Sequence, residues 1–380
     1  MNNERIIEAE FDSALTLLHD LCLIPAPSGK EDGRANYCLE FFRGLGLEDA
    51  YIDESKNAVC FLGPKDSDII LFMAHTDTVF PDEVLLPYHD DGKRIYSPGV
   101  GDDTACLAIM MSCIKYIVEK GITLKHRLMF VANSCEEGLG NLKGCRQIFK
   151  DYGDKIKRMY TFDGMYDAVV NKSVGSHRYR VTVETEGGHS FNHFGNTNAI
   201  AVLAEIIGKI YTIEVPKVKG SKTTYNVGII EGGTSVNTIA QEASALVEYR
   251  SDNVKCLSVM EKSFSDIFDS VRGKCKKIIV ERVGDRPCMD GVDEEKMKAL
   301  TELVTNVQKK YGGTDVKINS GSTDCNIPHS LGIPAICVGV YMGGGMHTRE
   351  EWLEKESIKT GLCIALELML SEGQGGGIKQ

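Results

Sequence analysis

The sequence of 380 residues predicts an α/β protein whose main domain is interrupted by a smaller α+β domain. Three observations predict this arrangement. Helical and extended patterns alternate up to residue 173, the order of elements changes over residues 174–286, and the first pattern returns from residue 287 onward. We therefore expect one domain made of residues 1–173 and 287–380, and a second domain inserted between them at 174–286.

The elements of the first part follow from the spacing of apolar residues. Apolar positions recur every three or four residues in two amphipathic helices, and short apolar runs with β-type residues mark three strands. A long apolar segment between the last two strands predicts a buried helix. The expected helices are 4–24, 31–43 and 103–120, and the expected strands are 57–62, 68–74 and 127–133. Their alternation predicts a sheet covered by helices on both faces.

The inserted segment has a different order of elements. Polar and apolar residues alternate in its strands, as in an antiparallel sheet with one exposed face. The expected strands are 177–186, 223–231, 239–250 and 276–283, and the expected helices are 197–210 and 255–272. The resulting β-α-β-β-α-β order is typical of a ferredoxin-like sandwich. After Pro287 we expect helices 293–311 and 356–371, a strand near 314–318 and an apolar strand within 333–340.

Composition and charge exclude several classes of protein. Hydrophobic residues make up 42% and charged residues 26% of the chain, as in ordinary folded domains. A net charge of −11 disfavours nucleic acids and anionic membranes as partners. We expect neither a membrane-spanning segment nor a secretory signal. The thirteen cysteines include no Cys-x-x-Cys pair, which favours a reduced, cytoplasmic setting over a disulfide framework or a thiolate-bound metal.

Potential metal ligands follow the predicted strands. His75 and Asp77 end the strand 68–74, and on an extended segment they point to the same side. Glu136 and Glu137 follow the strand 127–133. Ligands of open α/β sheets bind at the carboxyl ends of strands, so these positions favour a functional site over incidental surface charge.

Three further segments add ligands of the same kind. Asp102 and Asp103 lie in a glycine-containing turn before the buried helix, where either could instead cap that helix. Asp163 ends another apolar segment, and His347 follows three glycines. These glycines lack the lysine spacing of a phosphate-binding loop. Carboxylates combined with two imidazoles suit zinc, manganese or cobalt rather than a thiolate site.

At these residues the chain resembles a family of dinuclear metallo-hydrolases. This family includes peptidase T, carnosinase-type dipeptidases, glutamate carboxypeptidase, acetylornithine deacetylase and the aminoacylases. The resemblance extends over nearly the whole chain and is carried by Ala74-His75-Thr76-Asp77-Thr78, Gly101-Asp102-Asp103, Glu136-Glu137-Gly138, Asp163, Gly187-Gly188-His189-Ser190, Gly321-Ser322-Thr323-Asp324 and His347. Peptidase T is the most similar member around Asp163. The chain departs from common family patterns at Thr104 and at Phe191, and both departures bear on substrate preference.

The resemblance implies a fold and a set of residue roles. The larger domain would be a phosphorylase/hydrolase-like catalytic domain with a central mixed sheet, and the inserted domain a dimerisation or lid domain. One divalent metal would be held by His75, Asp102 and Asp163, and a second by His347, Glu137 and the shared Asp102. Asp77 would orient His75, and Glu136 would be the general base that activates a water bridging the metals. The peptide bond between Asp102 and Asp103 would be cis.

The resemblance also implies roles for residues of the inserted domain. His189 would donate a hydrogen bond to the developing oxyanion, reaching the site of the partner subunit in a homodimer. The alternative is that His189 merely caps the helix expected near 197–210. Asn237 would contact the substrate. Arg250 is a candidate clamp for a substrate carboxylate, although it could equally serve the structure of its strand.

These roles favour a cytoplasmic, homodimeric metallopeptidase that cleaves short peptides. It would be an aminopeptidase, dipeptidase or tripeptidase that uses two divalent ions, zinc being expected and manganese or cobalt possible. The closest alternative is a deacylase of an N-acyl amino acid, because the same site cleaves any amide. A third hypothesis is a non-catalytic binding protein of the same fold, which would be expected to have lost a metal ligand or the base.

Overall fold

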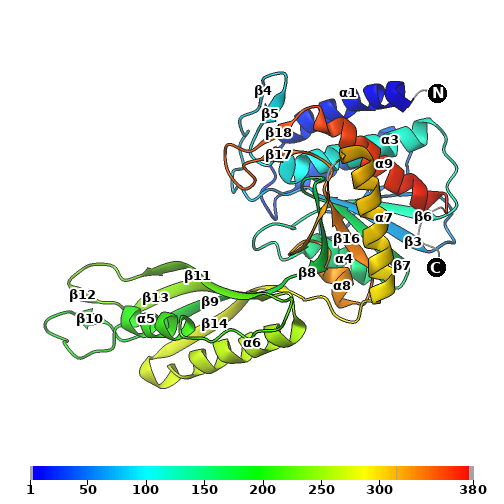
Figure 1. Cartoon of the computed structure of the whole chain (residues 1–380). Coiled ribbons are helices and arrows are strands. Elements are labelled where there is room, and N and C mark those ends of the chain that lie inside the picture. The colour runs from blue at the N-terminus through cyan, green and yellow to red at the C-terminus, as the bar shows by residue number, and fades with distance from the viewer. Residues whose placement is uncertain (1–2, 314, 376–380) are drawn as a thin grey trace. The chain divides into compact units, whose positions relative to one another are not determined.

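The computed structural model describes residues 3–313 and 315–375 (Figure 1). Its contacts divide the chain into two compact units, here called the larger unit (Met1–Lys172 with Asp290–Gln380) and the inserted unit (Ser173–Met289). The sequence placed the corresponding boundaries at 173/174 and 286/287. Within the described residues, no helix combines the length and the apolar character needed to cross a membrane.

The larger unit is built on a mixed sheet of eight strands in the order β1-β2-β6-β3-β7-β16-β8-β15. The central strands β6, β3, β7 and β16 are parallel to one another, whereas β1, β2 and β8 pair antiparallel. The strands are β1 (Tyr51–Ile52), β2 (Ala58–Leu62), β3 (Ile69–His75), β6 (Arg127–Asn133), β7 (Ile156–Phe162), β8 (Ala168–Ser173), β15 (Lys317–Gly321) and β16 (Ala335–Val338). The predicted α/β class with a mixed central sheet is confirmed.

Side chains of β3 pack on both faces of this sheet. Leu71 and Met73 join one apolar cluster with Ile148 of helix α4 (Lys143–Tyr152). Phe72 points the other way, where its ring stacks on those of Phe130, Tyr160 and Phe162. All seven residues of β3 are buried. Burial of each large apolar side chain contributes about 1.5–3 kcal/mol, so the continuous apolar run of the sequence becomes the rigid centre of the unit.

Helices cover the two faces of the sheet unequally (Figure 1). On the Phe72 face, α3 packs against α1 and α9, and α9 packs against α7. On the opposite face, α4 packs against the short helix α8. The helices are α1 (Asn3–Cys22), α2 (Asp32–Gly44), α3 (Cys106–Glu119), α7 (Glu294–Gly312), α8 (Asn326–Ser330) and α9 (Ser357–Gly373). A small sheet β17-β18-β5-β4 lies beside them, formed by β4 (His89–Asp90), β5 (Arg94–Tyr96), β17 (Gly343–Gly344) and β18 (Trp352–Glu354).

The inserted unit is a four-stranded antiparallel sheet in the order β11-β13-β9-β14. Two helices, α5 and α6, share one apolar core with the strands. The elements are β9 (Gly175–Glu184), α5 (Ala199–Ile210), β11 (Thr223–Gly232), β13 (Glu242–Ser251), α6 (Val254–Asp269) and β14 (Lys277–Arg286). This is the β-α-β-β-α-β order that the sequence predicts. A two-stranded ladder of β10 (Gly188–His189) with β12 (Thr238–Ile239) was not predicted.

Several expected boundaries were wrong. The buried helix expected from residue 103 begins at Cys106, because an irregular turn, η1 (Val100–Ala105), precedes it. The strand expected over 239–250 divides into β12 and β13, because residues 240 and 241 leave the ladder. The strand near 314–318 begins at Lys317, and residue 314 lies outside the described part of the chain.

The buried His329 of α8 makes the stability of the protein depend on pH. Its ring Nε2–H donates to the carbonyl of Ala335 at 2.8 Å, and burial lowers its pKa to about 4. The unfolded chain takes up this proton near pH 6.5, so the stabilising contribution of the neutral ring is lost as the pH falls from about 6.5 to about 4. We expect the free energy of unfolding to fall by about 3 kcal/mol more in the wild type than in His329→Gln over this range.

Chemical denaturation of both proteins at a series of pH values measures this difference. Because the other titrating groups are common to the two proteins, their contributions cancel in the comparison. If the free energies of unfolding of the two proteins changed equally between pH 6.5 and 4, His329 would not be held neutral by its burial.

Candidate metal centre

Neighbouring parallel strands of the larger unit bring the predicted ligands to one edge of the sheet. His75 is the last residue of β3, Glu136 and Glu137 follow β6, and Asp163 follows β7. These three strands are adjacent and parallel, so their carboxyl ends meet. Asp102 reaches the same place from η1, whose Asp102–Asp103 peptide bond is cis as the family resemblance implies.

The ligand atoms form two groups that share Asp102. In one group, His75 Nε2 lies 3.1 Å from Asp102 Oδ1, and Asp163 completes a set of atoms within 4.8 Å of one another. In the other, His347 Nε2 lies 2.9 Å from Asp102 Oδ2 and 3.2 Å from Glu137 Oε1. Each oxygen of Asp102 therefore faces a different imidazole, which is the arrangement expected of a carboxylate that bridges two cations.

The charges of these groups fit divalent cations. Burial and the neighbouring charge of Asp102 raise the pKa of Asp163 to about 7. Burial opposes ionisation of Asp102, yet hydrogen bonds from His347 and His75 hold its pKa below the usual value. Hydrogen bonds to Asp102 and Glu137 raise the pKa of His347 to about 10. Protons on these side chains thus offset part of the negative charge of the clustered carboxylates. Divalent cations can replace these protons on the same nitrogen and oxygen donors.

Asp77 holds both His75 and the paired glutamates. The Nδ1–H of His75 donates to the backbone carbonyl of Asp77 at 3.0 Å, with the Asp77 carboxylate 3.4 Å away. That carboxylate accepts the backbone N–H groups of Glu136 and Glu137, both at 3.0 Å, and the hydroxyl of Ser28 at 2.6 Å. Nε2 of His75 is thereby left to face the cation position, and the two glutamates are fixed by their backbone.

Glu136 lies beside the two groups that share Asp102. Its side chain is 6% exposed, and its carboxylate belongs to a third set of potential ligand atoms with His75 and Glu137. A carboxylate next to the cation positions but outside both Asp102 groups has the placement that a general base requires.

Glu351 is a buried carboxylate of this site to which sequence reasoning gave no role. It accepts the backbone N–H groups of Gly99 at 2.9 Å, Gly101 at 2.8 Å and Asp102 at 2.9 Å. These three bonds fix the turn that presents Asp102. The sequence indicates Glu351 only through its position four residues after His347. Its hydrogen-bond partners are backbone groups, which a sequence does not distinguish.

Removing the Glu351 carboxylate should weaken metal binding without removing a ligand. We expect Glu351→Ala to lower metal affinity about 10- to 100-fold, because the turn carrying Asp102 loses three hydrogen bonds. Competition with a chromogenic chelator measures this change, and the exposed neighbour variant Glu350→Gln is the matched control. Equal affinities in Glu351→Ala and the control would show that the turn holds its shape without Glu351.

The inserted unit brings His189 and Asn237 together. His189 pairs with Thr238 in the β10–β12 ladder, and the N–H of Ser190 donates to the carbonyl of Asn237 at 3.0 Å. Nδ1 of His189 accepts backbone N–H groups at 3.2 and 3.4 Å, so the neutral ring carries its proton on the exposed Nε2. His193, which the sequence did not single out, accepts the N–H of His189 at 3.0 Å. His189 does not cap α5, whose N-cap is Asn198.

The structure does not place Arg250 near His189. It pairs with Ser176 near the start of β9, whereas the ladder containing His189 follows the opposite end of that strand. Its guanidinium binds both carboxylate oxygens of Glu248, at 2.8 and 3.0 Å. This bidentate pair engages the edge of the guanidinium formed by Nε and Nη2, and Nη1 lies outside it.

The fold and this site define a class of protein. An α/β sheet whose strand ends carry two sets of nitrogen and carboxylate donors joined by one carboxylate suits a metal-dependent hydrolase. A sequence model described as Peptidase family M20/M25/M40 matches residues 71–371, and the chain belongs to this family. It is therefore an amide hydrolase of metallopeptidase type.

Comparisons with individual proteins agree with this assignment. The chain is 24% identical over 372 residues to succinyl-diaminopimelate desuccinylase of Corynebacterium glutamicum, covering 94% of this chain and 96% of the relative. It is also 24% identical to carboxypeptidase G2 of a Pseudomonas species, covering 96% and 91%. The crystal structure of a Staphylococcus aureus tripeptidase has the same fold, with a TM-score of 0.76, 23% identity and coverage of 94% and 97%.

Proposed function

We propose that the protein is an exopeptidase that removes a residue from short peptides with the help of two divalent cations. The observation that carries this proposal is Asp102, whose two oxygens face His75 and His347 separately. His75, Asp102 and Asp163 would hold one cation, and His347, Glu137 and Asp102 the other. Nitrogen and carboxylate donors without thiolate favour zinc, with manganese or cobalt as alternatives.

The role of each residue in the reaction follows from whether its side chain can accept or donate a proton. Cations bound to these residues would supply the Lewis acidity that polarises the scissile carbonyl and acidifies a water. Glu136 accepts the proton of that water and delivers it to the nitrogen of the leaving amine. Asp77 keeps Glu136 in place through its backbone N–H. Arg250 would hold a substrate carboxylate through the edge of its guanidinium that Glu248 does not engage.

A substrate panel tests the proposal. Di- and tripeptides with free amino termini should be hydrolysed with a higher kcat/KM than N-acyl or N-succinyl amino acids. The second candidate, an N-acyl amino acid deacylase, is supported by the likeness to the Corynebacterium desuccinylase, and it predicts the reverse order. Hydrolysis of neither class by metal-replete protein would contradict both functions and support a binding protein of this fold.

We further propose that the protein is a cytoplasmic homodimer in which His189 serves the partner's site. Support comes from the exposed position of His189 and from its Nε2–H, which is free to donate because Nδ1 accepts backbone N–H groups. All thirteen cysteines are free and most are buried, which suits a reducing compartment. Asn237 lies next to His189 and would contact the same substrate.

Mixing two inactive variants distinguishes action in trans from action in cis. His189→Ala and Glu136→Gln subunits should each be inactive alone, and after exchange each mixed dimer should regain one competent site. The expected activity is about half that of a wild-type dimer, because the other site of the mixed dimer carries both defects. A monomeric protein, or no recovery after exchange is verified, would rule out the arrangement in trans.

A further inference from the structure

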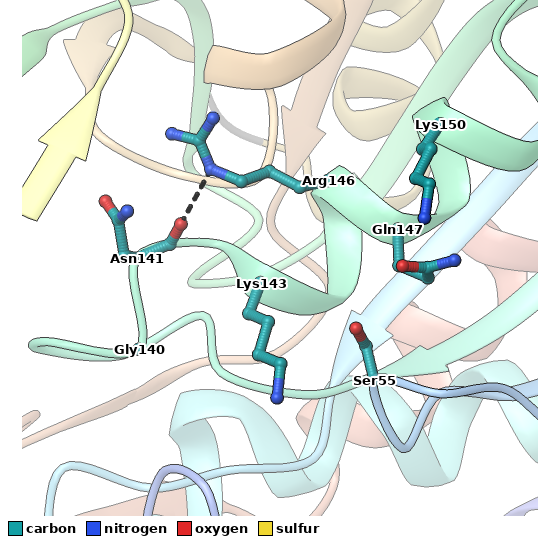
Figure 2. Close-up of a pocket in the computed structure, with 7 residues that line it drawn as sticks. All are labelled: Ser55, Gly140, Asn141, Lys143, Arg146, Gln147 and Lys150. Carbon is teal, nitrogen blue, oxygen red and sulfur yellow. Dashed lines mark hydrogen bonds between the residues drawn. The ribbon is translucent and has the colours of Figure 1, made fainter.

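An open pocket of about 420 Å³ lies on the larger unit, between helix α4 and the turn at Ser55 (Figure 2). Its lining contains three basic side chains and no acidic one. Lys143, Gln147 and Lys150 lie on one face of α4, since they are separated by four and three residues. The two lysines are about 10 Å apart along the helix axis, so their flexible ammonium groups can reach one ligand.

Three polar groups of this pocket have no hydrogen-bond partner among the described residues: the ammonium groups of Lys143 and Lys150 and the hydroxyl of Ser55. Neither Lys143 nor Lys150 has a side-chain ion pair or hydrogen bond within the described part of the chain. Ser55 is 5% exposed, and among the described residues nothing hydrogen-bonds its hydroxyl. Its backbone, in contrast, is fully engaged, because its N–H donates to Asp53 and its carbonyl accepts from Ser134. Figure 2 shows the Ser55 hydroxyl turned toward the side of α4 that carries Gln147.

The nearby carboxylates are committed to other partners. Asp53 accepts the N–H of Ser55 at 2.8 Å and the side-chain amide of Asn57 at 2.6 Å. Asp151, one position beyond Lys150, accepts the side-chain amide of Gln147 at 2.8 Å. Neither Asp53 nor Asp151 forms an ion pair with Lys143 or Lys150 within the described part of the chain, and their amide hydrogen bonds leave the negative charge of both carboxylates in place.

We propose that this pocket binds a small phosphate-type anion, a phosphomonoester or pyrophosphate. Two unpaired ammonium groups supply point charges, and the Ser55 hydroxyl supplies a directional donor, a combination that suits phosphate oxygens. The open pocket has room for a phosphorylated small molecule or pyrophosphate. Nucleic acid does not fit, because the overall charge of the chain repels it.

The pocket is connected to the segment that carries Glu136 and Glu137. The hydroxyl of Ser134 donates to the carbonyl of Ser55, and the side chain of Asn57 accepts the N–H of Ser134 at 3.0 Å. The same Asn57 side chain donates to the carbonyl of Gly144, in the first turn of α4, at 2.9 Å. An anion bound both to Ser55 and to the lysines of α4 would therefore hold residues 134–144 in place. Occupancy should slow amide hydrogen exchange in this segment.

Calorimetric titration of the holoenzyme with pyrophosphate at fixed ionic strength tests the site. We expect saturable binding that is at least tenfold weaker in Lys143→Gln/Lys150→Gln and several-fold weaker in Ser55→Ala. The matched control is Lys125→Gln, which should bind as the wild type does; it removes an exposed lysine elsewhere on the larger unit that has no ion pair among the described residues. Unchanged thermal midpoints and far-UV circular dichroism without added anion would verify that the variants are folded.

Two further arms separate this site from other ways of binding an anion. After chelation of the metals, binding should persist in the wild type and remain weakened in the double variant. Loss of binding on chelation would place the anion on the metals, and equal binding in the double variant would place it elsewhere. Competition by citrate as strong as that by pyrophosphate would overturn the preference for phosphate. None of these results depends on the proposed peptidase activity.

Discussion

Glu136→Gln should keep both cations and lose turnover, with kcat falling by about 10²- to 10⁴-fold. Glutamine matches the shape of glutamate but cannot accept the proton of the attacking water. The backbone N–H of residue 136, which binds Asp77, remains available in the variant, so the local structure should hold. Metal content by mass spectrometry and the rate of tripeptide hydrolysis are the two measurements.

Glu350→Gln, an exposed glutamate near the same site, is the control for loss of one negative charge. Its metal content and rate should equal those of the wild type. If Glu136→Gln retained both metals and hydrolysed peptides at a rate close to that of the control, another group would have to be the base.

Asp102→Ala should lose both cations, because Asp102 is the member common to both ligand groups. The loss of affinity should exceed the about 10- to 100-fold that removal of an outer hydrogen-bonding partner costs. Without the carboxylate, nothing offsets the repulsion between the two cations, and His75 and His347 each lose a neighbour. Metal content after dialysis against buffer of defined free zinc measures the effect.

Asp163→Ala provides the contrast for this experiment. Asp163 belongs to the group with His75 but not to the group with His347. We therefore expect this variant to lose one cation and keep the other. Equal residual metal in Asp102→Ala and Asp163→Ala would show that Asp102 is not shared.

The fold was predictable wherever its elements bury long apolar surfaces. The strand β3 and most of helix α3 are recognisable in the sequence as apolar segments, because both are largely buried. Helix α4 was missed, since its core contact rests on a narrow stripe of Cys145, Ile148 and Phe149 among charged residues. Such a helix is stabilised by packing on the sheet rather than by its own pattern. The strands of the small sheet, two or three residues long, are too short for any period to show.

The candidate site was predictable as a set of residues but not as a geometry. Positions at strand ends and the family resemblance indicated the metal-ligand side chains. Neither could show that the carboxylate of Asp77 binds the backbone of Glu136 and Glu137, or that Glu351 fixes the turn at Asp102. Backbone donors carry no residue type, so a sequence does not reveal them. The pairing of Arg250 with Glu248 could have been anticipated, because residues two apart on a strand share a face.

Titration of chelated protein with zinc, followed by tripeptide hydrolysis, tests most directly whether this chain is a two-metal peptidase. The account predicts no hydrolysis at zero zinc and a maximal rate at two equivalents per chain. Full activity in the chelated protein, or a maximum already reached at one equivalent, would contradict it.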